Sequence, residues 1–185
     1  PLEVFEWPSL LKNLFQVAKF KTTADDKNKT KLYHKRSKFV RDINHSKDEL
    51  TYLQSIKLEA KIHSFDQSNI SRAAQLCHKT NQFNLRSVRH SAQDLLSLNK
   101  MNSELCFLVS LNDVYGNHGV VGLVCMKQIN SDTAFLDTFL MSCRIFGRHL
   151  DSWMLKQALL ICNRNGFENL IAGFVETKRN QVAKS

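Results

Sequence analysis

The sequence has 185 residues, of which 43% are hydrophobic, which is enough for one globular domain with an apolar core and a connecting arm. Two prolines and six glycines exclude a fibrous or low-complexity protein. The formal net charge of +9 favours an acidic partner, such as a nucleic acid, a phosphorylated cofactor, an anionic membrane or an acidic protein.

The first 45 residues are predicted to form an arm. Residues Pro1–Pro8 have an extended pattern, and apolar residues at helical spacing predict a helix over Leu10–Phe20. From Lys27 to Arg41 there are seven basic residues and no acidic one, which fits either an anion-binding patch or, as we favour, a solvated helix face or a mobile linker. No aromatic residues interleave with these cations at a base-stacking spacing, so we expect no nucleic-acid partner.

Helices and one strand are predicted over the next fifty residues. A capping box, Ser46-x-x-Glu49, predicts a helix through Gln54. Strict alternation over 56–65 predicts a half-buried strand. Ser68 or Asn69 can cap a helix that ends near Thr80, and a second capping box, Ser91-x-x-Asp94, predicts a helix through Leu98.

The rest of the sequence predicts four strands and one long helix. The strands are expected at 105–111, 120–127, 133–145 and 169–174, with a turn over 112–119. The helix is expected over 150–165, with Gly166 at the position after its C-cap. The resulting order, β-α-α-β-β-β-α-β, predicts an α/β protein with a mixed sheet and helices on its faces.

Cysteine and histidine patterns predict neither a metal site nor disulfides. The five cysteines form no C-x-x-C pair and stand mostly among apolar residues, so we expect reduced core thiols in a cytoplasmic protein. The seven histidines lack metal-ligand spacing. No apolar run is long enough for a membrane span, and none resembles a signal peptide, so we expect no membrane partner.

The segment Arg144–Leu150 has the composition of a phosphate-binding loop. It lies where a strand passes into a helix, whose first N–H groups carry the positive end of the helix dipole. Gly147 would let a phosphate approach the backbone, and Arg144 and Arg148 would add charged donors. The alternative is a surface turn with solvated arginines.

In its place after the fourth strand, this segment resembles the R-x-x-G-x-G/A loop of the GNAT acyltransferase fold. The resemblance implies that a phosphopantetheine arm, on coenzyme A or on an acyl carrier protein, pairs with the fourth strand where the fifth splays away. The residues implied in cofactor binding are Leu140, Ser142, Arg144, Gly147, Arg148 and His149, of which His149 stands where the family has glycine or alanine.

Three longer strings resemble the C-terminal part of FkbH-family proteins from about Tyr52 to the end. They are Lys79–Leu85, then Val109–Asp113 with Gly116 and His118–Gly122, then Met141–Arg144 with Gly147–Arg148. The resemblance implies a GNAT-like domain that follows a haloacid-dehalogenase-like (HAD) domain. It also implies that the protein loads a glyceryl unit from 1,3-bisphosphoglycerate onto an acyl carrier protein for polyketide or related biosynthesis.

The HAD nucleophile motif, D-x-D-x-T, does not occur in this sequence, which starts at Pro1 rather than Met. We therefore expect a piece of a longer polypeptide, in which residues 1–45 connect a preceding HAD-like domain to a GNAT-like domain over 46–185 that is truncated after its last strand. Its partners would be the acyl carrier protein and that HAD-like domain. The alternatives are a structural domain that docks the HAD domain and an independent acetyl-CoA-dependent N-acetyltransferase.

Candidate acid–base groups are few. Asp137, expected on the strand face of Phe135, Phe139 and Met141, could act as a base or be a paired structural acid, the reading that we favour. Asp113 and His118 could contact a substrate at a strand end or serve the turn. Cys143, next to Arg144, could be a transfer thiol, but its apolar setting favours an inert core cysteine.

Overall fold

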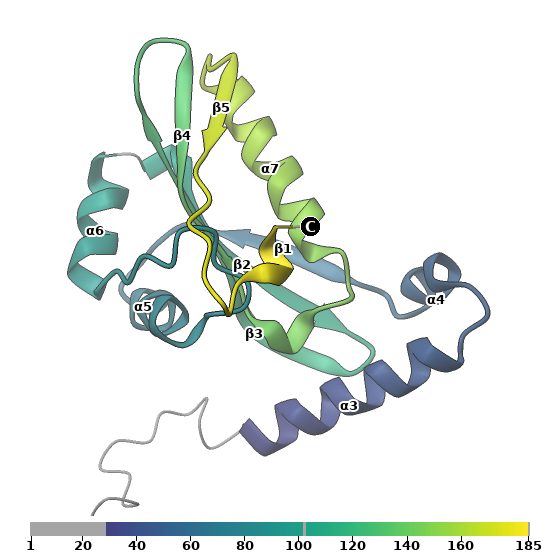
Figure 1. Ribbon diagram of the computed structural model, residues 1–185. Helices are drawn as coiled ribbons and strands as arrows, with labels where there is room; N and C mark the ends of the chain where they lie inside the picture. Colours follow the sequence, from purple (N-terminus) through teal and green to yellow (C-terminus); the bar gives the residue numbers. More distant parts are fainter. Residues whose placement is uncertain (1–28, 102, 185) are drawn as a thin grey trace, which may run out of the picture.

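Residues 29–101 and 103–184 are described by a computed structural model, in which one five-stranded sheet crosses the molecule (Figure 1). The helices predicted from 46 onward and all five predicted strands are present in the predicted order, whereas the segments Pro1–Pro8 and Leu10–Phe20 lie outside the described residues. The strands are β1 (Glu59–His63), β2 (Cys106–Asp113), β3 (Gly116–Gln128), β4 (Thr133–Met141) and β5 (Asn169–Ala172).

The strands lie side by side in the order of the sequence, β1-β2-β3-β4-β5. Neighbouring strands from β1 to β4 are antiparallel, whereas β4 and β5 run parallel. A parallel neighbour needs a crossover connection, which the helix α7 (Leu150–Arg164) supplies. The mixed sheet expected from the sequence is thereby confirmed.

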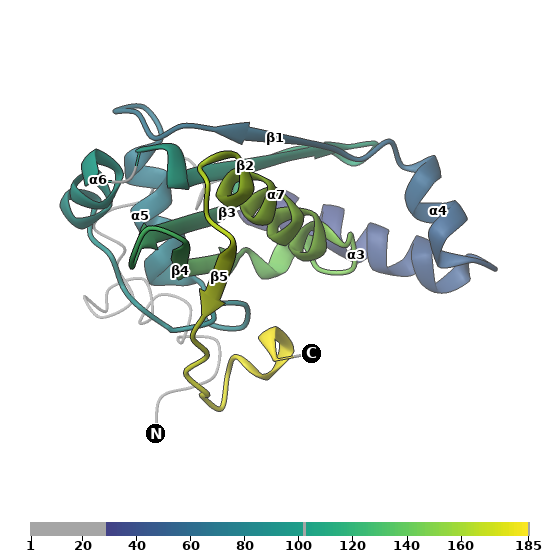
Figure 2. The same cartoon turned by 90° about the horizontal axis from the view of Figure 1, so that it is seen from above.

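Helices cover both faces of this sheet, as Figures 1 and 2 show. One face carries α5 (Ile70–Lys79) and α6 (Ala92–Met101), which bury Ala73, Leu76 and Leu95 against β2, β3 and β4. The opposite face carries α7, which buries a stripe of residues at helical spacing: Leu150, Met154, Ala158 and Cys162. Gly166 follows α7 at a φ of 81°, the left-handed conformation predicted for it.

The capping predictions have mixed outcomes. The Ser91–Asp94 box is present, because the Ser91 N–H donates to Asp94 (2.8 Å) and the Asp94 N–H donates to Ser91 Oγ (3.2 Å). The Ser46 box is wrong: α4 (Glu49–Ser55) is capped by Asp48, whose carboxylate accepts from the Thr51 N–H at 2.9 Å. A carboxylate two residues farther along the chain takes the role predicted for Ser46.

Several strand boundaries also differ from the prediction, most clearly at the β2–β3 turn and at the end of β4. The turn expected over 112–119 is a tight hairpin, since β2 runs to Asp113 and β3 already starts at Gly116, which has a φ of 107° that favours glycine. The fourth strand ends at Met141, because residues Cys143–Ile145 form a short 3-10 helix, η4.

The basic stretch is helical in the described structure and packs on the domain. Its residues from Lys29 onward belong to α3 (Lys29–His45), which lies across the β2–β3 hairpin in Figure 1. Phe39 of α3 is buried with Leu53 and Ile56 in a small apolar core that is separate from the cores on the two faces of the sheet. Within the described ranges, no helix is long and apolar enough to cross a membrane.

Candidate functional site at the junction of β4 and α7

The predicted phosphate-binding residues lie on the connection between β4 and α7, hereafter the junction (residues 142–149). Ser142 donates its N–H to the Val121 carbonyl of β3 at 2.8 Å, which ends the strand, and η4 then turns the chain toward α7. Gly147 has a φ of 83° and His149 a φ of 52°. Only glycine adopts such angles without strain, so the junction is a tight double turn that sends successive side chains in different directions.

Arg148 points into the protein. Its side chain is 0% exposed, and its Nε donates to Asp113 Oδ2 at 2.9 Å. Asp113 Oδ1 also lies 2.9 Å from His118 Nε2, so the hairpin supplies a carboxylate between two nitrogen donors. Arg148 is therefore not the solvated arginine of the surface-turn alternative, and in this conformation its side chain is not open to a phosphate.

Burial and hydrogen bonding have opposite effects on the pKa of Asp113. Burial would raise the pKa of its carboxyl, but the bonds from His118 and Arg148 outweigh burial and hold that pKa below its ordinary value. Asp113 is thus a charged structural partner at neutral pH. With His118 4% exposed, neither residue has the open face that a general base needs.

Arg144 joins the same group of residues from the other side. Its Nη2 donates to the carbonyl oxygen of His118 at 2.6 Å, and its side chain is half-buried. Arg144 and Arg148 thus both contact residues of the β2–β3 hairpin, and their joint contact with a phosphate stays a prediction. These hydrogen bonds from the two arginines hold the β2–β3 hairpin against the start of α7.

The edge of β4 next to the junction is already occupied. Residues Phe83–Leu85, from the connection between α5 and α6, lie along it as a short antiparallel segment, with Asn84 opposite Leu140. The Leu85 N–H donates to the Phe139 carbonyl at 3.2 Å, and the Met141 N–H donates to the Phe83 carbonyl at 3.0 Å. The backbone expected to pair with a pantetheine arm is therefore paired with the chain itself.

The site thus does not accept a pantetheine arm in this conformation. Leu140 is 0% exposed in the sheet core, and Val175 closes the far side of the segment by donating its N–H to the Leu85 carbonyl at 2.9 Å. Gly147 and His149 remain exposed, and His149 Nε2 lies 3.2 Å from Glu49 Oε1 of α4. Two of the six predicted cofactor contacts thereby keep an open surface.

Asp137 forms a separate cluster on the α5–α6 face. The register of β3 and β4 shifts opposite Asp137, which lies as an extra residue between Leu136 and Thr138. This bulge turns Asp137 away from the core of Phe139 and Met141, so the face predicted to be shared with these two residues is wrong.

Three cationic or titratable groups surround this carboxylate. Arg86 Nη1 lies 2.8 Å and Lys127 Nζ 2.6 Å from its Oδ1, and His90 Nε2 lies 3.3 Å from its Oδ2. Burial opposes ionisation, but the bonds from His90 and Lys127 hold the pKa of Asp137 below its ordinary value. Asp137 is a paired acid, as favoured from the sequence. Arg86 and His90 were missed as its partners because they lie about fifty residues away in the chain.

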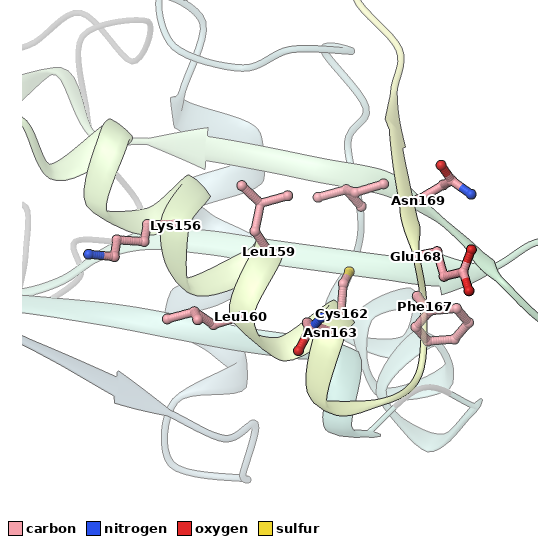
Figure 3. A pocket seen from close by; sticks show the side chains of 9 residues that line it. Lys156, Leu159, Leu160, Cys162, Asn163, Phe167, Glu168 and Asn169 are labelled. Atoms are coloured by element: carbon pink, nitrogen blue, oxygen red, sulfur yellow. The ribbon is translucent and has the colours of Figure 1, made fainter.

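Most of the thiols are buried, and a surface pocket lies away from the predicted site residues. Cys143 is half-buried and the other four cysteines are buried. A pocket of about 330 Å³ opens between α7 and β5, lined by Leu159, Leu160 and Phe167 among others (Figure 3), and none of the predicted site residues reaches it. Within residues 29–101 and 103–184, no cluster of three or more His, Cys, Asp or Glu side chains could hold a metal ion.

A comparison with protein-family profiles and with curated sequences gives no match. Solved structures do match. The Mycobacterium tuberculosis protein Rv2747, in complex with CoA and NLQ, superposes with a TM-score of 0.51 and 14% identity over 64% of this chain and 66% of that one. Ard1 from Thermoplasma volcanium superposes with a TM-score of 0.47 and 14% identity over 58% of this chain and 66% of that one. A GNAT family acetyltransferase of Staphylococcus aureus superposes with a TM-score of 0.42 and 17% identity over 66% of this chain and 90% of that one.

The chain thus spans about two thirds, 66%, of the length of the mycobacterial and Thermoplasma proteins. The superposition with the mycobacterial protein covers 64% of this chain, whose sheet carries two helices on one face and one on the other. At 14% identity, this similarity shows a shared fold and does not show a shared activity or substrate. The chain has the GNAT fold, as its sequence predicted.

Proposed function

We propose that this chain is the GNAT-like module of an FkbH-type protein that loads a glyceryl unit from 1,3-bisphosphoglycerate onto an acyl carrier protein in natural-product biosynthesis. Residues 46–185 are the module, and residues 1–45 are the arm that connects it to a HAD-like domain. Its part in that reaction is to receive the carrier, whose phosphopantetheine thioester reaches the junction. Coenzyme A carries the same arm.

The observation that carries this proposal is that the family-like strings contact one another at the junction. Phe83, from the first string, accepts a hydrogen bond at its carbonyl from the N–H of Met141, from the third string, at 3.0 Å. Asp113, from the second, holds Arg148 of the third. Segments far apart in sequence that meet at one place are what a shared site requires.

The charge of the chain fits an acidic carrier. The net charge is +9, and the exposed part of α3 adds cations beside the junction, among them Lys38, whose Nζ lies 5.8 Å from the Tyr115 ring centre. A positive surface draws an acidic protein and its phosphate toward the site and raises the association rate at low salt.

A second candidate is a non-catalytic platform that docks the HAD-like domain. The observation that favours it is the pairing of Phe83–Leu85 with β4, which fills the place that the arm would take. An independent acetyl-CoA-dependent N-acetyltransferase has only the fold in its favour, because Asp113, His118 and Asp137 are all held in structural contacts.

The experiment is a titration of the protein with one acyl carrier protein in two forms, with and without the phosphopantetheine arm. We expect tighter binding of the form that carries the arm. Arg144→Ala should weaken that preference, whereas Arg164→Ala, which removes the same charge from the exposed end of α7, should leave it unchanged.

Each other result has a distinct meaning. Equal affinity for the two carrier forms would reject arm binding and leave the docking platform. Binding of neither form would reject the carrier as a partner. Release of free thiol from acetyl-CoA with amine acceptors would replace the proposal with an independent acetyltransferase.

A further inference from the structure

α3 lies directly over Arg148. The ring of Phe39 stacks on the guanidinium, with 3.8 Å between the ring centre and Cζ, and Phe39 is 1% exposed. The same ring packs against the junction backbone, since a Cβ added to Gly147 would come 3.3 Å from its Cε1. One side chain of the arm thus covers the arginine of the predicted phosphate-binding loop and lies next to its exposed glycine.

Arg148 has two donors that nothing satisfies. Its Nε is bonded to Asp113, but Nη1 and Nη2 are buried and have no hydrogen-bond partner. Buried guanidinium donors without a partner are rare and costly. Two neighbouring N–H groups of one guanidinium match two oxygens of a phosphate, while the Nε bond to Asp113 holds the plane in place.

The cover over Arg148 is lightly attached. Phe39 is the only buried residue among residues 31–45 of α3. The other contacts of α3 with the domain are half-buried or exposed: Ile43 packs on the small core, the Tyr115 hydroxyl donates to Asp42 Oδ2 at 2.6 Å, and Lys35 Nζ donates to the Asn117 carbonyl at 3.3 Å. A helix held by one fully buried side chain, one half-buried one and a few polar contacts opens more readily than the core elements.

We propose that α3 is a displaceable cover of a phosphate subsite, in which Phe39 holds the place of a phosphate group over Arg148. When Phe39 withdraws, Nη1 and Nη2 of Arg148 and the start of α7 face the opening and bind the phosphate of an incoming arm. This inference rests on the proposed function and adds its regulation: the arm that links the module to the preceding domain controls access to the carrier's phosphate.

The test uses inorganic pyrophosphate as the probe, because it needs the subsite and not the edge of β4. Calorimetric titration compares the wild type with Phe39→Ala and with Val40→Ala, a control on the adjacent exposed residue of α3. We expect Phe39→Ala to bind about tenfold tighter or more, since a site that is mostly covered loses apparent affinity in proportion. Val40→Ala should match the wild type, and adding Arg148→Lys to Phe39→Ala should abolish the gain.

A second variant and a second measurement guard against misfolding of Phe39→Ala. Tyr115→Phe removes the hydroxyl that bonds Asp42 and Tyr52 without touching Arg148, and it should also tighten pyrophosphate binding. In the wild type, saturating pyrophosphate should speed amide hydrogen exchange in α3 and leave exchange in α5 unchanged.

The outcomes separate the cover from the proposed function. Measurable pyrophosphate binding that Phe39→Ala and Tyr115→Phe leave unchanged or weaken overturns the cover alone, as does unchanged exchange in α3. If the wild type and both variants bind neither pyrophosphate nor coenzyme A, the phosphate subsite is absent and the proposed carrier-arm function falls with the cover.

Discussion

Asn84 lies opposite Leu140, in an antiparallel bridge that joins the connection between α5 and α6 to the edge of β4. Farther along, the same edge pairs with β5 through residues 133–136 of β4. The Asn84 segment therefore continues the sheet where β5 has already left it. The sequence string that most resembles the FkbH family is thus a piece of sheet that closes the splay between β4 and β5.

Asn180 is predicted to hold this closure together. Its side chain is 0% exposed, its Nδ2 donates to the carbonyls of Asn84 (3.0 Å) and Val175 (2.9 Å), and its Oδ1 accepts from the Thr177 N–H (2.8 Å). Asn180→Ala leaves these buried groups unpaired and should lower the free energy of unfolding by about 1–3 kcal/mol.

Urea denaturation measures the effect of Asn180→Ala. Gln181→Ala is the control, because its side chain is exposed and bonds only Glu176 and the Thr177 carbonyl. We expect that control to change the free energy of unfolding by no more than about 0.5 kcal/mol. An equal loss in both variants would mean that Asn180 has no special part in the closure.

The ion pair between Arg148 and Asp113 should be costly to break from one side. Both side chains are 0% exposed, so Arg148→Met leaves a buried carboxylate with His118 and the Tyr115 N–H as its remaining partners. We expect a loss of about 3–5 kcal/mol in the free energy of unfolding. Adding Asp113→Asn to Arg148→Met should recover part of that loss, because the uncompensated charge disappears.

The check on this pair is a double-mutant cycle by urea denaturation. If the changes in the free energy of unfolding caused by Arg148→Met and Asp113→Asn simply add, the two residues do not act as a pair. Their 2.9 Å contact would then not hold the hairpin to the start of α7.

The sheet was predictable because its signals are local. Alternation marked the first strand, and the turn residues Asn130–Asp132 separated the third strand from the fourth. The C-terminal glycine of α7 was predictable for the same reason, since Gly166 follows the last apolar position of the helix.

The site was less predictable because its partners are distant in sequence. Spacing placed Arg144 and Arg148 together at a helix N-terminus, but periodicity carries no information on which carbonyl or carboxylate each would reach. The bulge that re-aims Asp137 and the pairing of Asn84 with β4 depend on tertiary contacts. Phe39 was hidden within a basic stretch whose charge suggested a solvated helix face.

The lowered pKa of Asp137 predicts that part of the protein's stability is lost at acidic pH. Its pKa in the folded protein lies below the ordinary 3.8, so the folded state binds its proton less readily than the unfolded state does. The stability that Asp137 contributes is therefore fully present above about pH 4 and is lost as the pH falls below that value. The variant Asp137→Asn should show a smaller loss of stability on acidification.

Urea denaturation between pH 7 and pH 2.5 checks this prediction. At pH 7, Asp137→Asn should already be less stable than the wild type, since Arg86 and Lys127 lose their shared carboxylate. Glu104→Gln, at an exposed position of the short helix η3 (Ser103–Leu105), serves as control and should keep the wild-type pH dependence. Parallel curves for Asp137→Asn and the wild type would contradict the prediction.

Cys143 should be the thiol that reacts first in the folded protein. It is half-buried, whereas the other four cysteines are buried, and burial raises the pKa of Cys77 to about 11. A thiol reagent at neutral pH should therefore label one cysteine quickly and all five only after unfolding. Peptide mapping identifies the labelled residue, and Cys143→Ser should remove the fast reaction. Fast labelling of Cys77 would show that the α5 core opens.

His149 stands in a strained position whose relief should stabilise the protein. Its φ of 52° places it in the left-handed region at the start of α7, and its side chain reaches only Glu49, an exposed partner, at 3.2 Å. His149→Gly removes the Cβ that makes this conformation costly and should raise the free energy of unfolding by about 0.5–1 kcal/mol. His149→Ala keeps the Cβ and should bring no gain, so thermal denaturation of the two variants separates backbone strain from loss of the Glu49 contact. Equal melting temperatures for the glycine and alanine variants would show that the turn is not strained. A higher melting temperature for His149→Gly alone would show that the histidine found where the GNAT loop has glycine or alanine costs stability through its backbone.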